Sequence, residues 1–210
     1  MNTIDLRGTW HLSRVGGEVV CPVDIPGDIM TALMKAKIIE DPYRGMNETL
    51  AQWAGREAWI LQRRFDCPPE VLTYSDCFVE LEHVDTFAEV SVNETVVGSC
   101  SNMFLRNRFN VAGVLQEGEN TISISLRSAE LEAERLAGEL PYPIPHTQYP
   151  VQSQHRNLIR KTQCHAGWDW GPCLMTCGIY GNAAVYASPL EHIEYVHCDL
   201  SRHDGTWHLT

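Results

Sequence analysis

The chain is poor in basic residues and has no long apolar run. It contains 16 Lys and Arg against 27 Asp and Glu, a formal net charge of −11. Nucleic acids and anionic lipid surfaces are attracted by basic patches, so this balance argues against both as partners. No apolar run approaches the roughly 20 residues that cross a membrane, and the N-terminus lacks the pattern of a secretory signal. We therefore expect a cytoplasmic protein, and a neutral substrate such as a sugar is compatible with its charge.

The cysteines lack the close pairing that zinc sites and disulfide frameworks require. The 8 cysteines are spread along 210 residues, and Cys164, His165, Cys173 and Cys177 do not show the C-x₂-C spacing of zinc ligands. We expect buried, reduced thiols, no metal and no other cofactor. The chain also has no phosphate-binding glycine loop, nucleophile elbow or internal repeat.

What the chain does contain is a series of short alternating segments. Apolar and polar residues alternate, with polar turns between the segments, at residues 6–12, 59–65, 78–84, 89–93 and 121–126, and residues 183–186 are typical of a closing strand. Segment 6–12 is typical of an edge strand, residues 117–120 of a turn, and Asn93-Glu94 of a tight turn. Short strands at regular spacing favour a β-sandwich.

Two short helices interrupt the strands, and a new pattern follows them. Asp28 is a candidate N-cap for a helix that extends to about Lys37, and Ser128 for one that extends to about Ala137. Beyond residue 189, two further alternating stretches at 193–200 and 206–210 predict the start of another domain. We therefore divide the chain into residues 1–188 and 189–210, and we expect it to be a fragment cut inside the second domain.

The most informative stretch is Gly-Trp-Asp-Trp-Gly-Pro at residues 167–172. Gly and Pro break regular structure, so we expect a shaped loop here and not the interior of a strand or helix. An indole face packs against the C–H face of a sugar ring, and Asp169 can accept hydrogen bonds from two neighbouring hydroxyls. Composition alone favours a packed corner of a β-domain over a sugar site. We expect Trp170 to pack beneath the loop.

Blocks of residues cover nearly the whole chain in a fixed order, at 25–29, 41–48, 53–59, 84–90 with 92–93, 102–104, 118–120 and, within 160–172, Arg160-Lys161, His165 and 167–172. Together they resemble the N-terminal domain of β-mannosidases, in the glycoside hydrolase family (family 2) that also contains β-galactosidases and β-glucuronidases. The resemblance implies an all-β fold, a galactose-binding-like jelly-roll β-sandwich with short helices, followed by the first strands of a truncated immunoglobulin-like domain. In that family a (β/α)₈ barrel carries both catalytic glutamates, and a barrel needs roughly 250 residues. We therefore expect no catalytic residue and no activity in this chain alone.

The resemblance also implies roles for individual residues. Trp168 would form a wall of the terminal-sugar subsite, and Asp169 would hydrogen-bond the hydroxyls of a β-mannoside, in a pocket completed by the barrel against which this domain packs. Arg56 and Glu57 are candidates for facing the substrate, and an ion pair that fixes their turn is an equal alternative. We expect His165 to brace the loop as a hydrogen-bond donor.

The sequence is compatible with three functions. The first is the N-terminal part of a retaining exo-β-mannosidase, which removes terminal β-linked mannose through a covalent mannosyl-enzyme. The second is a stand-alone carbohydrate-binding, lectin-like module, which should end after the strand near Tyr186. The third is a related glycosidase that acts on galactose, glucuronate or glucosamine.

Overall fold

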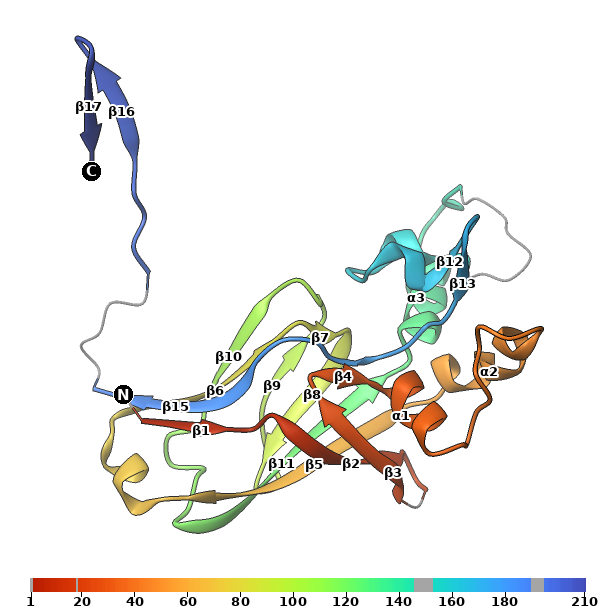
Figure 1. Cartoon of the computed structure of the whole chain (residues 1–210), viewed down its shortest axis with the longest axis horizontal. Coiled ribbons are helices and arrows are strands. Elements are labelled where there is room, and N and C mark those ends of the chain that lie inside the picture. The colour runs from red at the N-terminus through yellow and green to blue at the C-terminus, as the bar shows by residue number, and fades with distance from the viewer. Residues whose placement is uncertain (1, 18, 146–152, 190–194) are drawn as a thin grey trace.

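Two antiparallel sheets form the body of the molecule (Figure 1), which is a computed structural model that describes residues 2–17, 19–145, 153–189 and 195–210. The larger sheet has the strand order β3-β2-β5-β11-β8-β9 and the smaller one β1-β15-β6-β10. The larger sheet consists of β2 (Gly8–Arg14), β3 (Val19–Ile25), β5 (Trp59–Cys67), β8 (Phe87–Val92), β9 (Thr95–Cys100) and β11 (Gly118–Arg127). The smaller sheet consists of β1 (Asn2–Asp5), β6 (Asp76–Glu82), β10 (Arg106–Asn110) and β15 (Ala183–Ser188). The expected all-β sandwich is confirmed.

The alternation in the sequence corresponds to one buried face on each central strand. In β5, Trp59, Leu61 and Phe65 are buried, whereas Gln62 and Arg64 are exposed. The two fully buried tryptophans are also satisfied as donors, because the Trp10 and Trp59 indole N–H groups donate to the carbonyls of Leu6 at 2.7 Å and Ala54 at 2.9 Å. Both buried indole N–H groups are therefore paired inside the core.

Three α-helices accompany the sandwich: α1 (Ile29–Lys35), α2 (Asn47–Arg56) and α3 (Ala129–Gly138). Both predicted N-caps are confirmed. Asp28 Oδ1 accepts a hydrogen bond from the Thr31 backbone N–H at 3.1 Å, and Ser128 Oγ accepts one from Leu131 at 3.1 Å. None of the helices in the described residues is long and apolar enough to span a membrane.

Helix α2 was not predicted from the sequence, which indicated only a turn at Arg56 and Glu57. The residues it buries are small, Ala51, Ala54 and Gly55, and it has no side-chain N-cap. Its larger apolar side chains, Leu50 and Trp53, are 71% and 38% exposed. The buried positions of this helix are occupied only by small residues, so its buried face shows no stripe of large apolar side chains by which the sequence would reveal a helix.

Three strand predictions need correction. Segment 6–12 is not an edge strand, because β2 lies between β3 and β5, and the edge is β3, where Pro22 lacks a backbone N–H. Strand β11 begins inside the predicted turn at 117–120, since Gly118 pairs with Cys67. In the last segment, β16 (Leu200–His203) and β17 (Thr206–Leu209) form a separate hairpin, and 195–199 is not a strand. Residues 193 and 194 lie outside the described residues.

The Asn93-Glu94 turn is confirmed. Both residues have positive φ, 47° and 66°, as a two-residue type I′ hairpin turn requires. It joins β8 to β9, which pair directly.

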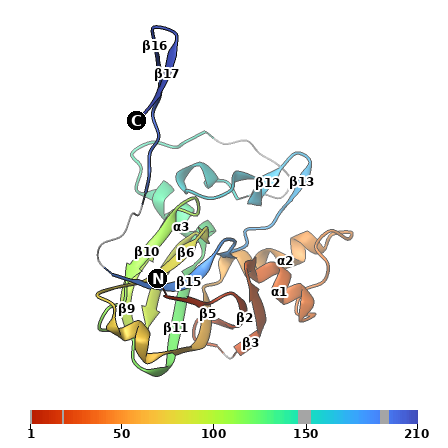
Figure 2. The ribbon, with the colours of Figure 1, turned by 60° about the vertical axis from the view of Figure 1, so that its left-hand side comes forward.

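Several short elements gather with α1 and α2 at one end of the sandwich, on the right in Figures 1 and 2. Strands β4 (Gly27–Asp28), β14 (Gly178–Ile179) and β7 (Val84–Asp85) form a small sheet in the order β4-β14-β7. Strands β12 (Ala166–Trp168) and β13 (Gly171–Cys173) form a hairpin. The short helices η2 (Arg156–Leu158) and η3 (Gln163–His165) precede this hairpin in the chain, whereas η1 (Pro69–Thr73) connects β5 to β6.

The motif at residues 167–172 is therefore not a free-standing loop. Trp168 pairs with Gly171 and Ala166 with Cys173, so the motif is the tip of the β12–β13 hairpin, and only Asp169 and Trp170 form the connection. Gly167 has φ of +94°, a region that favours glycine, which lets this residue serve within a strand. The same glycines that suggested a loop are compatible with a tight hairpin.

Candidate functional site

The β12–β13 hairpin rests on a small hydrophobic cluster separate from the core of the sandwich. The cluster combines residues of β8, α3, the hairpin and the segments before and after the hairpin: Phe87, Ala129, Ala133, Ile159, Ala166, Cys173 and Met175. Burial of these side chains stabilises the base of the hairpin and leaves its tip outside the cluster.

Helix α2 holds the hairpin by polar contacts. The Cys173 backbone N–H donates to Glu48 Oε1 at 2.5 Å, and Gln52 Nε2 donates to the Cys173 carbonyl at 2.8 Å. Two side chains one helical turn apart thus satisfy both backbone groups of one hairpin residue.

The tip of the hairpin carries two exposed indoles. Trp168 is 37% and Trp170 77% exposed, and their ring centroids are 6.4 Å apart with an interplanar angle of 59°. Asp169 between them is exposed, and it has no hydrogen bond or ion pair with the described residues. The expectation that Trp170 packs beneath the motif is wrong, because the cluster below is filled by other side chains and the turn holds this indole outward.

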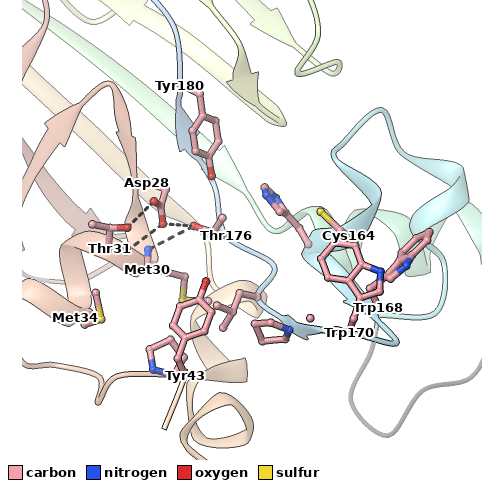
Figure 3. A pocket seen from close by; sticks show the side chains of 15 residues that line it. Asp28, Met30, Thr31, Met34, Tyr43, Cys164, Trp168, Trp170, Thr176 and Tyr180 are labelled. Atoms are coloured by element: carbon pink, nitrogen blue, oxygen red, sulfur yellow. Dashed lines mark hydrogen bonds between the residues drawn. The ribbon is translucent and has the colours of Figure 1, made fainter.

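A pocket of about 340 Å³ lies between the hairpin and α1 (Figure 3), a size within the range of small-molecule sites. Trp168, Trp170 and His165 line it, but Asp169 does not. Its lining is mostly apolar, with a polar group at the α1 end, and comprises Asp28, Met30, Thr31, Met34, Pro42, Tyr43, Cys164, His165, Trp168, Trp170, Gly171, Pro172, Leu174, Thr176 and Tyr180.

The polar end of the pocket is built on Asp28. Besides capping α1, its Oδ1 accepts a hydrogen bond from Thr176 Oγ1 at 2.7 Å, and its Oδ2 accepts one from Thr31 Oγ1 at 2.8 Å (Figure 3). Burial, with Asp28 and Asp85 nearby, raises the pKa of Tyr180, so its phenol stays neutral and can donate a hydrogen bond. This end of the pocket therefore offers hydroxyls and an engaged carboxylate, a surface suited to a neutral, hydroxyl-rich ligand.

A buried ion pair lies beneath the polar end. The Lys161 ammonium, 2% exposed, donates to Asp85 Oδ2, and the Asp85 side chain is fully buried. Lys161 Nζ also donates to the Thr176 carbonyl at 2.7 Å, and Thr86 Oγ1 donates to Asp85 Oδ1. Burial by itself would raise the pKa of Asp85, but the His165 ring, the Lys161 ammonium and the Thr86 hydroxyl together hold it below its ordinary value.

Thr176 connects this ion pair to α1 through its backbone carbonyl on one side and its hydroxyl on the other. The connection is possible because β14 passes closely between β4 and β7, where Gly178 pairs with both Asp28 and Asp85. A Cβ on Gly178 would lie 2.2 Å from the Gly27 carbonyl oxygen, so only glycine fits there. Two carboxylates 57 positions apart in the sequence, Asp28 and Asp85, are thereby fixed on either side of one strand.

His165 lines the pocket next to the ion pair. Its Nδ1 lies 3.7 Å from Asp85 Oδ2, too far for a hydrogen bond, and is buried with no hydrogen-bond partner among the described residues. The bracing expected of this residue comes from its main chain: its N–H donates to the Thr162 carbonyl at 3.2 Å, and its carbonyl accepts from Leu174 at 2.9 Å.

Arg56 and Glu57 are not among the residues that line the pocket, and each is in an ion pair with another element. Arg56 Nη1 lies 2.8 Å from carboxylate oxygens of both Glu130 and Glu134, which joins α2 to α3. Glu57 pairs with Arg14 at 3.3 Å. The two residues fix the position of α2 through these partners, and they do not pair with each other.

All eight cysteines lie in the described part of the chain and are free thiols. Six are buried, and burial raises the pKa of Cys77 and Cys100 to about 11 and that of Cys173 to about 12. The expectation of buried thiols holds for these six. Cys164 and Cys198 are exposed, because one lies beside the pocket and the other in the segment before β16.

The fold and the site together define a galactose-binding-like β-sandwich that carries a Trp-Asp-Trp hairpin. Residues 10–181 match the family described as glycosyl hydrolase 2 galactose-binding domain-like, and the chain belongs to this family.

Among curated proteins, the chain is similar to the β-mannosidases of Mus musculus (30% identity over 195 residues) and Bos taurus (32% over 197 residues). These matches cover 91% and 92% of this chain but only 22% of each relative. The chain therefore spans about a fifth of the length of these relatives.

Among solved structures, the β-D-mannosidase of Dictyoglomus thermophilum matches 96% of this chain and 24% of that one, with a TM-score of 0.91 and 33% identity. The β-D-glucuronidase from the same organism matches with a TM-score of 0.63 and 16% identity, which shows the fold alone. The resemblance to the N-terminal domain of β-mannosidases is thereby confirmed.

Proposed function

We propose that this chain is the sugar-recognising N-terminal part of a β-mannosidase-type exo-glycosidase. The observation that carries the proposal is the hairpin tip of a chain of this family, where a carboxylate without a hydrogen-bond or ion-pair partner among the described residues lies between two exposed indoles. The Trp168 indole offers a face for the apolar side of a pyranose ring, and Asp169 accepts hydrogen bonds from two neighbouring hydroxyls of a terminal mannose. The adjacent pocket offers further hydroxyl contacts at its α1 end.

The chain's part in the reaction is binding, not bond cleavage. Glycoside hydrolysis requires two carboxyl groups on either side of the scissile bond, roughly 5–10 Å apart. Asp28 is the one carboxylate among the residues that line the pocket, and its oxygens already accept hydrogen bonds from Thr31 and Thr176. We therefore place the acid/base and the nucleophile of a retaining reaction in a separate barrel domain of the complete enzyme, which closes over the hairpin.

We also propose that the protein resides in a reducing compartment such as the cytoplasm. All eight cysteines are free, and two of them are exposed, a state that an oxidising environment does not maintain.

The experiment compares the isolated chain with the complete enzyme on p-nitrophenyl β-D-mannoside, β-D-galactoside and β-D-glucuronide. We expect turnover of the mannoside by the complete enzyme alone. If the complete enzyme preferred the galactoside or the glucuronide, that sugar and not mannose would be its substrate. Turnover by the isolated chain above a heat-inactivated control would contradict the division of roles, and sugar binding without any hydrolysis by the complete protein would favour a lectin-like module.

A further inference from the structure

Arg156 is in contact with the hairpin at its Trp168 end. It lies in η2, outside the 160–172 block and the rest of the motif. Its Nη1 donates to the Gly167 carbonyl at 2.5 Å, and its Cζ lies 4.9 Å from the centroid of the Trp168 ring. One guanidinium thus contacts the backbone of one hairpin residue and the side chain of the next.

Trp168 has few other restraints in the described structure. The hairpin strands have only two register pairs, and Trp168 is not a member of the hydrophobic cluster below. Its one aromatic neighbour is the more exposed Trp170, at 6.4 Å. An indole that is 37% exposed and held so loosely can adopt several rotamers, and each has a different ring plane.

We propose that Arg156 is a positioning residue that fixes the Trp168 indole for stacking against a sugar, an inference that rests on the proposed function. A cation over the indole is held by the negative potential of the ring face, within the roughly 6 Å range of that interaction. The guanidinium lies over one side of the ring, and since Trp168 also lines the pocket, the proposal places the sugar against the other side. Because stacking depends on ring orientation, a fixed indole binds the sugar with less loss of side-chain entropy.

The geometry requires arginine in particular. Its planar group has five donors, so one N–H can bond to Gly167 while the group remains over the indole. A lysine at this position would have a single charged nitrogen to share between the carbonyl and the ring. Arg156→Lys should therefore keep part of the effect, and Arg156→Gln should lose most of it.

The chain contains a matched control. Arg202 lies over Trp207 at 5.5 Å in the separate β16–β17 sheet, so Arg202→Gln removes the same type of contact at an indole outside the site. The test uses the 210-residue chain, in which the 6 tryptophans give individual indole N–H signals in a ¹⁵N correlation spectrum.

Two quantities are measured for each variant: the Trp168 indole signal without sugar, and the dissociation constant for methyl β-D-mannopyranoside. We expect Arg156→Gln to shift or broaden the Trp168 signal and to weaken binding about threefold to tenfold. Arg156→Lys should give intermediate values, and Arg202→Gln should change only Trp207. Should Arg156→Gln fail to fold, Arg156→Lys carries the test.

An unchanged Trp168 signal in Arg156→Gln would overturn the inference, even if affinity fell, because the arginine would then act on the ligand directly. A changed signal with unchanged affinity would overturn it as well, since the orientation would not matter for binding. If the unsubstituted chain binds no mannoside at all, the proposed function fails, whereas the Trp168 signal still reports whether Arg156 orients the indole.

Discussion

Asp169→Asn is the substitution that separates a binding role of the hairpin tip from a structural one. Asparagine keeps the size and shape of the side chain but removes the charge and turns one acceptor oxygen into a donor group. In the complete enzyme, a carboxylate that accepts from two sugar hydroxyls loses its charge-assisted hydrogen bonds. We expect kcat/KM for p-nitrophenyl β-D-mannoside to fall by about 30- to 1,000-fold, the equivalent of ~2–4 kcal/mol.

Stability should hardly change, and the structure gives the reason. Asp169 is exposed in the two-residue connection of the hairpin and has no hydrogen bond or ion pair with the described residues. Exposed side chains without partners usually change the free energy of unfolding by no more than ~0.5 kcal/mol when substituted. The matched control is Asp204→Asn, an exposed aspartate in the turn of the β16–β17 hairpin.

The assay combines steady-state kinetics with thermal unfolding of the same preparations. A binding role of Asp169 is refuted if Asp169→Asn lowers the melting temperature substantially while the specific activity of the folded fraction stays normal. Asp169 would then be a structural brace of the hairpin. An equal loss of activity in Asp204→Asn would show that the effect is not specific to the site.

The remaining predictions concern the buried ion pair and the thiols. Lys161→Met should destabilise the fold by about 3–5 kcal/mol in denaturant unfolding, because it leaves the fully buried Asp85 carboxylate without its cation; a loss below about 1 kcal/mol would contradict this. The pKa of Asp85 is lowered in the folded state, so its ionised form stabilises the fold at pH values above the unfolded-state pKa of about 3.9. This stabilisation should be lost as the pH falls below that value. In acid titrations, the free energy of unfolding of Asp85→Asn should therefore depend less on pH than that of the unsubstituted chain. With a thiol reagent at mildly alkaline pH, only Cys164 and Cys198 should react rapidly, and a bound mannoside should slow the first, which lines the pocket; rapid reaction of further cysteines would refute the assigned burial.

Features that depend on neighbours in the sequence were predictable from it. The alternation in β5 follows from one buried face, and the caps by Asp28 and Ser128 depend on a backbone N–H three residues further on. The Trp-Asp-Trp motif could also be recognised from adjacent residues alone, although the hairpin that carries it was expected to be a loop. The sequence reveals such features because the residues involved lie within one helical turn or one strand of each other.

Features that depend on distant partners were not predictable. Asp85 and Lys161 are 76 positions apart, and nothing in either local segment indicates that their charges meet inside the protein. Arg156 carries no signal of its own, because its contact with Trp168 depends on how η2 packs against the hairpin.

The most direct test of sugar recognition by the hairpin is a titration of the ¹⁵N-labelled chain with methyl β-D-mannopyranoside, beside its C2 epimer methyl β-D-glucopyranoside. We predict that the mannoside shifts the indole signal of Trp168 in a saturable way and that the glucoside does so more weakly. The signals of the buried Trp10 and Trp59 should not move. A Trp168 signal that stays unchanged with both sugars, or that responds equally to both, would contradict the account.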